Sequence, residues 1–360
     1  MRNLMRKIHL YLSFVAGPFL LLIAITGIIH VFSEEITYYA NKDAIFITPQ
    51  QESKLQVDTL LRKVEESGFR PVGFLYNDAP DRSFYVLARD KSKNIQLYIN
   101  PYSGNIIKAS GLYDFFLFIE ELHTELCMGG SGRQFIGVIT FLFFILTVTG
   151  IIIWYPKKWS RETAKKSFLL KLKGNTFVIN YNLHKILGFY IIIPSIILSV
   201  TGVIIAFDPV EIALFNMVKI DGDYEVHVRQ IESESLPENV STISFHQLIQ
   251  PMINKGDVQV KMPRRNNSRY AVMEVDGNSF FIDRSNGSTS NIDPLTIKSV
   301  GVRKVITQLH SGREYGITYK IILFLTALIL FSLPITGLVI WYKKLRIKRV
   351  GDETRNNRLR

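Results

Sequence analysis

Residues 122–155 read LHTELCMGGSGRQFIGVITFLFFILTVTGIIIWY, and residues 309–342 read LHSGREYGITYKIILFLTALILFSLPITGLVIWY. Each stretch begins with Leu-His, passes through a short glycine-containing segment, and ends with a long apolar run closed by Trp-Tyr. A run of about 20 apolar residues is long enough to cross the hydrocarbon core of a bilayer. The same type of membrane span is therefore expected twice in this chain.

The spacing of histidines indicates an internal duplication of the whole chain. His123 and His310 each lie 26 residues before a Thr-Gly pair, and His9 and His184 each lie 17 residues before another. Repeats of this kind enter the membrane from the same side, so the sequence predicts parallel repeats related by an axis along the membrane normal. The threonines of the four pairs are Thr149, Thr336, Thr26 and Thr201.

Hydropathy predicts a four-span helical bundle with two external domains. The chain is 47% hydrophobic yet 21% charged, so apolar spans must alternate with sizeable polar regions. The predicted spans cover residues 10–32, 134–155, 184–207 and 317–342. The segments between and around them are an N-terminus (1–9), a first external domain (33–133), a basic loop (156–183), a second external domain (208–316) and a basic tail (343–360).

Basic residues set the predicted orientation. The N-terminus, the middle loop and the tail hold 18 of the 43 Lys and Arg residues but only three acidic ones. Because cytoplasmic loops are enriched in Lys and Arg, these three segments are expected in the cytoplasm and both large loops outside. The net charge of +12 is explained by this topology and by anionic lipid, and no nucleic-acid-binding motif accompanies it.

The two large loops are expected to fold as small α+β domains. Residues 95–104 and 279–287 alternate apolar and polar positions before a turn rich in Asn, Asp and Gly, which is typical of strands and hairpins. Residues 55–67 and 246–254 are expected to be helical. A basic cluster with Tyr270 (Lys261, Arg264, Arg265, Arg269) is either a solvated face or a guide for an anionic ligand.

Order and spacing of several motifs resemble the PepSY-associated transmembrane family, which includes bacterial inner-membrane ferric-siderophore reductases. The motifs are RKIHLYLSF (6–14), TGIIHVFSEEI (26–36), YINPYSG (98–104), LHTELCMGGSGR (122–133), NLHKILGF (182–189) and LHSGREYG (309–316). The resemblance implies PepSY-like external domains, periplasmic in location, and a haem-binding reductase or a relative of one. The turn Asp283-Arg284-Ser285-Asn286 departs from the Pro-Tyr-Thr type that the family usually has.

Four histidines form two symmetric candidate ligand pairs. His9 and His184 lie at the cytoplasmic ends of spans one and three, and His123 and His310 lie at the external face. A haem iron takes two axial nitrogens, which facing helices of a bundle can supply. The alternative for the first two is contact with lipid headgroups, and the alternative for the others is a hydrogen bond to backbone.

His30 is a third candidate at the external face. It lies 21 residues after His9, or about 31 Å along a helix, so the two cannot share one haem. His30 is expected either to ligate the external haem, to bond a propionate, or to mark the interface. His227 and His246 have no partner spacing and are expected on the surface. The Thr-Gly pairs are expected to serve mainly in helix packing, or to leave room for a porphyrin face.

These observations predict two haem b groups, held without covalent attachment, because Cys127 is the only cysteine and no Cys-x-x-Cys-His motif occurs. With no dinucleotide or phosphate-binding fingerprint, electrons are expected from a separate donor such as quinol or a reductase. The expected activity is reduction of a ferric siderophore outside the inner membrane. The alternatives are a non-enzymatic membrane protein that binds or regulates an envelope partner, and a transporter.

Overall fold

The computed structural model describes residues 1–170, 173–217, 235–236, 241–263, 268–275, 278–290 and 294–358. The chain divides into two compact units, a helical unit and a sheet unit. The helical unit contains Met1–Phe32, Ile119–Glu211 and Lys304–Arg360, and the sheet unit contains Ser33–Phe118 and Ile212–Arg303. Each unit therefore takes residues from both halves of the sequence.

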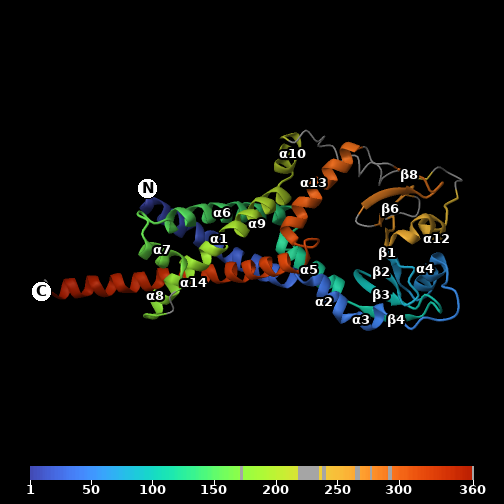
Figure 1. The fold of residues 1–360 in the computed structure, drawn as a ribbon, viewed down its shortest axis with the longest axis horizontal. Helices are drawn as coiled ribbons and strands as arrows, with labels where there is room; N and C mark the ends of the chain where they lie inside the picture. The colour runs from blue at the N-terminus through green and yellow to red at the C-terminus, as the bar shows by residue number, and fades with distance from the viewer. Residues whose placement is uncertain are drawn as a thin grey trace. The chain divides into compact units, whose positions relative to one another are not determined.

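Among the residues that the structure describes, three helices of the helical unit are long and apolar enough to cross a membrane: α1 (Arg2–His30), α6 (Gly130–Trp154) and the part Gly316–Ile347 of α14 (Gly316–Arg358). They run alongside one another (Figure 1), with α1 packed on both α6 and α14. The chain is therefore a membrane protein by length and composition of its helices.

A fourth apolar segment consists of two helices, α8 (Thr176–Tyr190) and α9 (Ile192–Ala206), which meet at a bend of 63°. The bend occurs where Pro194, in the first turn of α9, has no N–H to donate to the carbonyl of Tyr190. The sequence predicted one span over residues 184–207, and the structure divides the apolar segment there between α8 and α9 at this bend. Segment α8 packs on α14, and α9 packs on α6.

Basic side chains close the carboxyl ends of two of these helices. Arg133 on α6 donates from Nη2 to the carbonyl of Ile205 at 2.6 Å and to Oδ1 of Asp208 at 2.8 Å. Arg2 donates to the carbonyl of Ile153, near the end of α6, at 2.9 Å. A cation at the carboxyl end of a helix satisfies carbonyls that have no partner within the helix.

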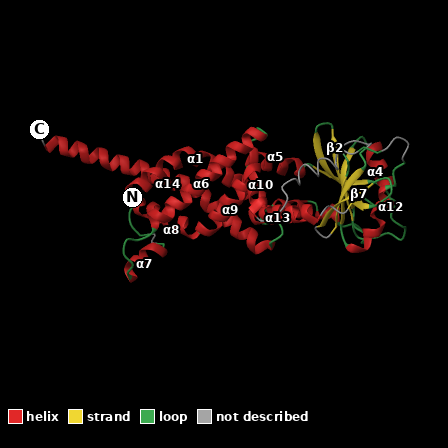
Figure 2. Cartoon of the chain, turned by 90° about the horizontal axis from the view of Figure 1, so that it is seen from above, coloured by secondary structure: helices red, strands yellow, loops and turns green. Residues whose placement is uncertain are grey.

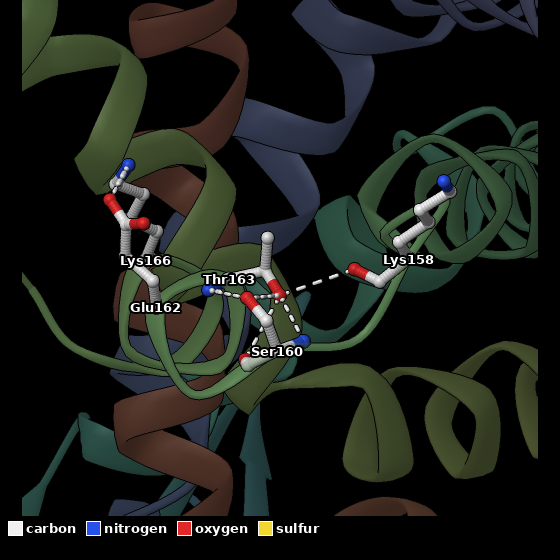
Figure 3. Close-up of polar contacts among 5 residues, drawn as sticks. All are labelled: Lys158, Ser160, Glu162, Thr163 and Lys166. Carbon is white, nitrogen blue, oxygen red and sulfur yellow. Dashed lines mark hydrogen bonds and ion pairs between the residues drawn. The ribbon is translucent and has the colours of Figure 1, made fainter.

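The segment between α6 and α8 contains the short helix α7 (Arg161–Phe168). Ser160 and Thr163 cap it reciprocally (Figure 3): Oγ of Ser160 accepts from the backbone of Thr163 at 3.2 Å, and Oγ1 of Thr163 accepts from the backbone of Ser160 at 2.7 Å. One turn further on, Lys166 pairs with Glu162 at 2.5 Å. Contacts between residues close in sequence thus stabilise helix α7.

The sheet unit is built on one antiparallel sheet of eight strands in the order β4-β3-β2-β1-β5-β6-β7-β8. Strands β1 and β5, from the two halves of the chain, pair at its centre. Gly73 on β1 permits this pairing, because a Cβ there would lie 2.9 Å from the carbonyl oxygen of Val260. The sequence predicted two separate external domains, whereas the structure joins both segments in one unit.

The strands are β1 (Arg70–Tyr76), β2 (Phe84–Asp90), β3 (Lys93–Ile99), β4 (Ile106–Ser110), β5 (Val258–Lys261), β6 (Tyr270–Val275), β7 (Asn278–Asp283) and β8 (Thr289–Ser290). Helices α4 (Val57–Glu66) and α12 (Phe245–Ile249) lie beside the sheet (Figure 2). Their side chains belong to the same apolar core as side chains of the strands. The predicted strands over 95–99 and 279–283 are confirmed. The predicted helical segments correspond to α4 and to α12 with the following turn η1 (Gln250–Lys255).

The other helices in the described part of the chain are α2 (Ser33–Ala40), α3 (Lys42–Ile45), α5 (Leu112–Glu125), α10 (Asp208–Met217) and α13 (Pro294–Ser311). Helices α5 and α13 matter most for function, because each ends with a predicted ligand in its last turn. These residues are His123 and His310, and both belong to the helical unit.

Candidate functional site

The helical unit brings His9 and His184 together as the first histidine pair. His9 lies on α1 and His184 on α8, so the two rings come from different halves of the chain. Their ring centres are 6.5 Å apart, and the ring planes are nearly perpendicular at 89°. This pairing is the one that the sequence predicted.

His123 on α5 and His310 on α13 form the second histidine pair. Their ring centres are 6.3 Å apart, with an interplanar angle of 65°. His123 bonds to Thr26, which lies 17 residues after His9 on the same helix α1. Seventeen residues correspond to about 25 Å along a helix, so the two pairs lie far apart along the unit.

Each of the four imidazoles bonds through Nδ1 to a threonine hydroxyl. His9 bonds to Thr149 at 2.9 Å and His123 to Thr26 at 2.9 Å. The second half of the chain repeats both contacts, with His184 bonded to Thr336 at 2.8 Å and His310 to Thr201 at 2.9 Å. Histidine and threonine always come from the same half but from different helices.

The hydroxyl geometry determines which imidazole nitrogen carries the proton. Every one of these threonines donates its own hydroxyl hydrogen to a carbonyl of its helix, as Thr149 does to Ile145 at 2.9 Å and Thr201 to Ile197 at 2.7 Å. Thr26 and Thr336 do the same. The hydroxyl oxygen can therefore only accept from the imidazole, which places the proton on Nδ1 and leaves a lone pair on Nε2.

Glycine supplies the surface against which each ring rests. A Cβ built on Gly27 would lie 3.4 Å from Cε1 of His123, and one on Gly337 would lie 3.4 Å from Cε1 of His184. The corresponding distances are 3.6 Å at Gly150 and 3.2 Å at Gly202. The sequence left open whether these glycines serve in packing or leave room for a porphyrin face, and the structure places an imidazole against each of them.

The ring separations match two ligands on opposite sides of one metal ion. An imidazole nitrogen binds a metal at about 2.0–2.1 Å and lies about 1.2 Å from its ring centre, so two ligands in line place the ring centres about 6.4 Å apart. The observed values of 6.5 Å and 6.3 Å agree with this figure. Both separations therefore fit two axial histidines on one haem iron.

Electrostatics of the second pair favour neutral ligands. Burial, together with the neighbouring imidazoles of His310 and His30, lowers the pKa of His123 to about 3. Burial lowers the pKa of His310 to about 4. Both rings are therefore neutral at pH 7, the state in which imidazole binds a metal.

His30 occupies a different position from the four paired histidines. Its Nε2 lies 3.2 Å from Nη2 of Arg313, a guanidinium donor, so this nitrogen acts as an acceptor. The second pair is already complete without it. Arg313 is part of the LHSGREYG motif (309–316), but it was not among the site residues predicted from the sequence.

Other predicted residues lie away from the pairs. His246 is in the sheet unit and bonds to Gln250 at 3.0 Å, whereas His227, Arg264 and Arg265 fall outside the described residues. Arg269 binds the buried carboxylate of Asp283 at 2.8 Å, so it supports the fold. Within the ranges that the structure describes, no cluster of three or more His, Cys, Asp or Glu side chains could hold a metal ion, and Cys127 is free and exposed.

Comparison with known proteins agrees with the fold and with these motifs. The model of the PepSY-associated TM region matches residues 6–344, nearly the whole chain. This protein therefore belongs to the PepSY-associated transmembrane family. No curated protein matches it.

Proposed function

We propose that this protein is a haem b-containing reductase that spans the bacterial inner membrane and reduces ferric iron held by a siderophore in the periplasm. The observation that carries the proposal is the presence of two histidine pairs at axial-ligand spacing, 6.5 Å and 6.3 Å between ring centres. A bound haem supplies a one-electron centre at each pair.

The chain's own residues prepare both positions. In the first pair, His9 on α1 and His184 on α8 lie with ring centres 6.5 Å apart, and Nε2 is left for a metal because Nδ1 is engaged by threonine. In the second pair, His123 and His310 do the same from α5 and α13. The proposed architecture has four spans, counting α8 and α9 as one, arranged as two parallel repeats that contribute one ligand each to both pairs.

Orientation follows from charge. The basic segments at residues 1–9, 156–183 and 343–360 favour a cytoplasmic location for both termini, which places the first pair at the cytoplasmic face and the second at the periplasmic face. The electron donor is a separate partner, quinol or a reductase. The ferric siderophore approaches from the periplasmic side, where reduction weakens binding by hard oxygen ligands that prefer ferric iron.

Anaerobic mixing of reduced protein with a chelate tests this function. The purified protein is reduced with stoichiometric dithionite and mixed with a ferric tris-hydroxamate chelate and a ferrous-iron indicator. We expect loss of the reduced α-band together with appearance of the ferrous complex. The gallium chelate, which has the same shape and cannot be reduced, serves as the control.

Two results would contradict the proposal. A haem-free protein from haem-sufficient cells would favour the non-enzymatic alternative, in which the external domain binds or regulates an envelope partner. A reduced protein that is not reoxidised by the ferric chelate would retain the haem assignment but reject this substrate class.

A further inference from the structure

The four candidate ligands share one local environment, although they come from four different helices. Each ring has a threonine hydroxyl on Nδ1 at 2.8–2.9 Å and the adjacent glycine against Cε1. We call each such Thr-Gly pair an imidazole seat. The four seats are Thr26-Gly27, Thr149-Gly150, Thr201-Gly202 and Thr336-Gly337.

We propose that the seat threonines are positioning residues that fix the tautomer, orientation and basicity of the haem-ligating histidines. This inference rests on the proposed haem ligation. Its structural part, that the hydroxyl holds Nδ1 protonated and Nε2 free, concerns the protein alone.

The direction of the hydrogen bonds assigns the proton to Nδ1 of each imidazole. At Thr26 the hydroxyl donates to the carbonyl of Leu22 at 2.8 Å, so its oxygen has only lone pairs left for His123. A chain of two hydrogen bonds then runs from imidazole to hydroxyl to helix carbonyl. Such a chain polarises the imidazole and increases electron density at Nε2.

Burial makes this arrangement effective. Thr26, Thr149 and Thr201 are 2%, 4% and 6% exposed, so water does not replace the bond if the hydroxyl is lost. Without the hydroxyl, the imidazole keeps a hydrogen bond to a backbone carbonyl of the seat helix, at Ile23 for His123 and at Leu198 for His310. The ring is then held less firmly, and any fraction with its proton on Nε2 cannot bind a metal. Outer partners of this kind typically contribute about 10–100-fold to metal affinity.

The seats also explain how two halves can share one ligand set. His9 rests on a seat from its own half, on α6, while its partner in the pair, His184, rests on a seat from the other half, on α14. Each half of the chain thus orients its own ring in the pair through its own seat. Loss of one seat should therefore affect one pair and leave the other pair unchanged.

Valine and serine replacements test the role of the hydroxyl. Thr149→Val and Thr336→Val remove it from the first pair, and Thr26→Val and Thr201→Val remove it from the second. Serine at the same positions retains the hydroxyl and should rescue. The matched controls are Thr147→Val on α6 and Thr326→Val on α14, because these hydroxyls bond only to their own helix, at Phe143 and Ile322.

The first readout needs no haem. Protein with nitrogen-15-labelled histidine is prepared in its haem-free form in detergent micelles, and signals are assigned with single histidine variants. We expect the four paired histidines to show the tautomer protonated at Nδ1. Each valine variant should shift only its own histidine toward a mixture, and the controls should shift none. Wild-type protein with these histidines protonated at Nε2 would overturn the inference.

The second readout uses the haem-loaded protein. Each valine variant should lose haem from its pair about tenfold faster, with a more positive midpoint potential for that haem because the ligand is less basic. Serine should restore both values. If the protein binds no haem, the proposed function fails, while the tautomer measurement still decides the role of the threonines. Haem with unchanged loss rate and potential in the valine variants would refute the positioning role alone.

Discussion

In the helical unit the two halves of the chain make matching contacts, whereas in the sheet unit they share a turn but differ in the charge that supports it. The helical unit repeats the same histidine-to-threonine bond in both halves. In the sheet unit, the turn after β3 begins at Asn100 and the turn after β7 begins at Asp283.

Both turns have the same backbone geometry. Gly104 donates to the carbonyl of Asn100 at 2.7 Å with φ of 78°, and Gly287 donates to the carbonyl of Asp283 at 2.8 Å with φ of 74°. In each turn a side-chain oxygen accepts from the backbone two residues later. Residues 283–286 therefore differ from the family's Pro-Tyr-Thr turn in their side chains, whereas the backbone conformation of the turn is retained.

The two units differ in how closely the residues of the two halves must match. The proposed ligation uses a histidine on both sides of each metal ion, and the matching histidine seats of the two halves agree with it. A turn requires only an acceptor and a residue that tolerates positive φ, so either Asn or Asp can begin it. The charge of Asp283 matters for another reason, because its carboxylate also pairs with Arg269. Five predictions test this contrast, in order of decreasing effect.

The largest effect is expected from removing a ligand. His9→Ala and His184→Ala should each eliminate the same haem, lowering the content from about two to about one per chain, because a haem with two axial histidines needs both. Haem content and the reduced α-band measure this. His246→Ala is the control, since this histidine bonds to Gln250 in the sheet unit. Unequal losses in the two variants would contradict a shared site.

In the sheet unit, Asp283→Asn should destabilise strands β6 and β7 by about 2 kcal/mol. The carboxylate is 2% exposed and pairs with Arg269, which is 36% exposed, so the loss is less than for a fully buried pair. Hydrogen exchange of peptides from β6 and β7, corrected for intrinsic rates, measures this. Asn100→Asp is the matched change in the other turn and should alter stability by about 0.5 kcal/mol or less.

The effect at Asp283 should depend on pH. Burial alone would raise the pKa of this carboxyl, but hydrogen bonds from Ser285 and Arg269 outweigh it and hold the pKa below its ordinary value. A carboxyl with a lowered pKa contributes stability above its ordinary pKa of 3.8, and that stability is lost as pH falls through the lower folded value. Wild type and Asp283→Asn should therefore converge in acid. A constant difference would contradict the charge-based account.

A smaller effect is expected at the glycines of the seats. A Cβ at Gly202 would lie 3.2 Å from Cε1 of His310 and 3.0 Å from Thr140, whereas one at Gly150 would lie 3.6 Å from His9. Gly202→Ala should therefore disturb the second pair at a cost of about 1 kcal/mol, while Gly150→Ala should be tolerated. Rates of haem transfer to apomyoglobin measure this. Equal rates for both variants would show that the seats are not this close to the rings.

The smallest effect is expected at His30. Since His30 Nε2 faces Arg313, His30→Ala should retain both haems and change only the potential of the haem at the second pair. Spectroscopic redox titration measures the two potentials separately, and Arg313→Gln provides the matched change in the partner. Loss of one haem in His30→Ala would instead identify His30 as a ligand.

Much of the site could be predicted from the sequence, because its signal is a repeated spacing. The distances from His9 and His184 to their following Thr-Gly pairs placed these histidines in equivalent positions, and the structure brings them together. The contact to threonine could not be predicted. His9 bonds not to Thr26 on its own helix but to Thr149 on α6, and that depends on how the helices rotate and pack.

The joining of the strands into one sheet and the bend between α8 and α9 could not be predicted from the sequence for a different reason. Alternation predicted individual strands, but the pairing of β1 with β5 joins residues such as Gly73 and Lys261, which are far apart in the chain. Hydropathy predicted the third span from its apolar content, which is the same for a straight and a bent helix. Only the position of Pro194 indicated where the break could fall.

We propose that each histidine pair binds one haem, and a count of haem per chain tests this proposal most directly. Protein purified in detergent from haem-sufficient cells should contain about two haem b per chain by the pyridine haemochromogen assay. His184→Ala and His310→Ala should each contain about one, and the double variant none. A colourless wild-type protein, or a double variant that retains its haem, would contradict the account.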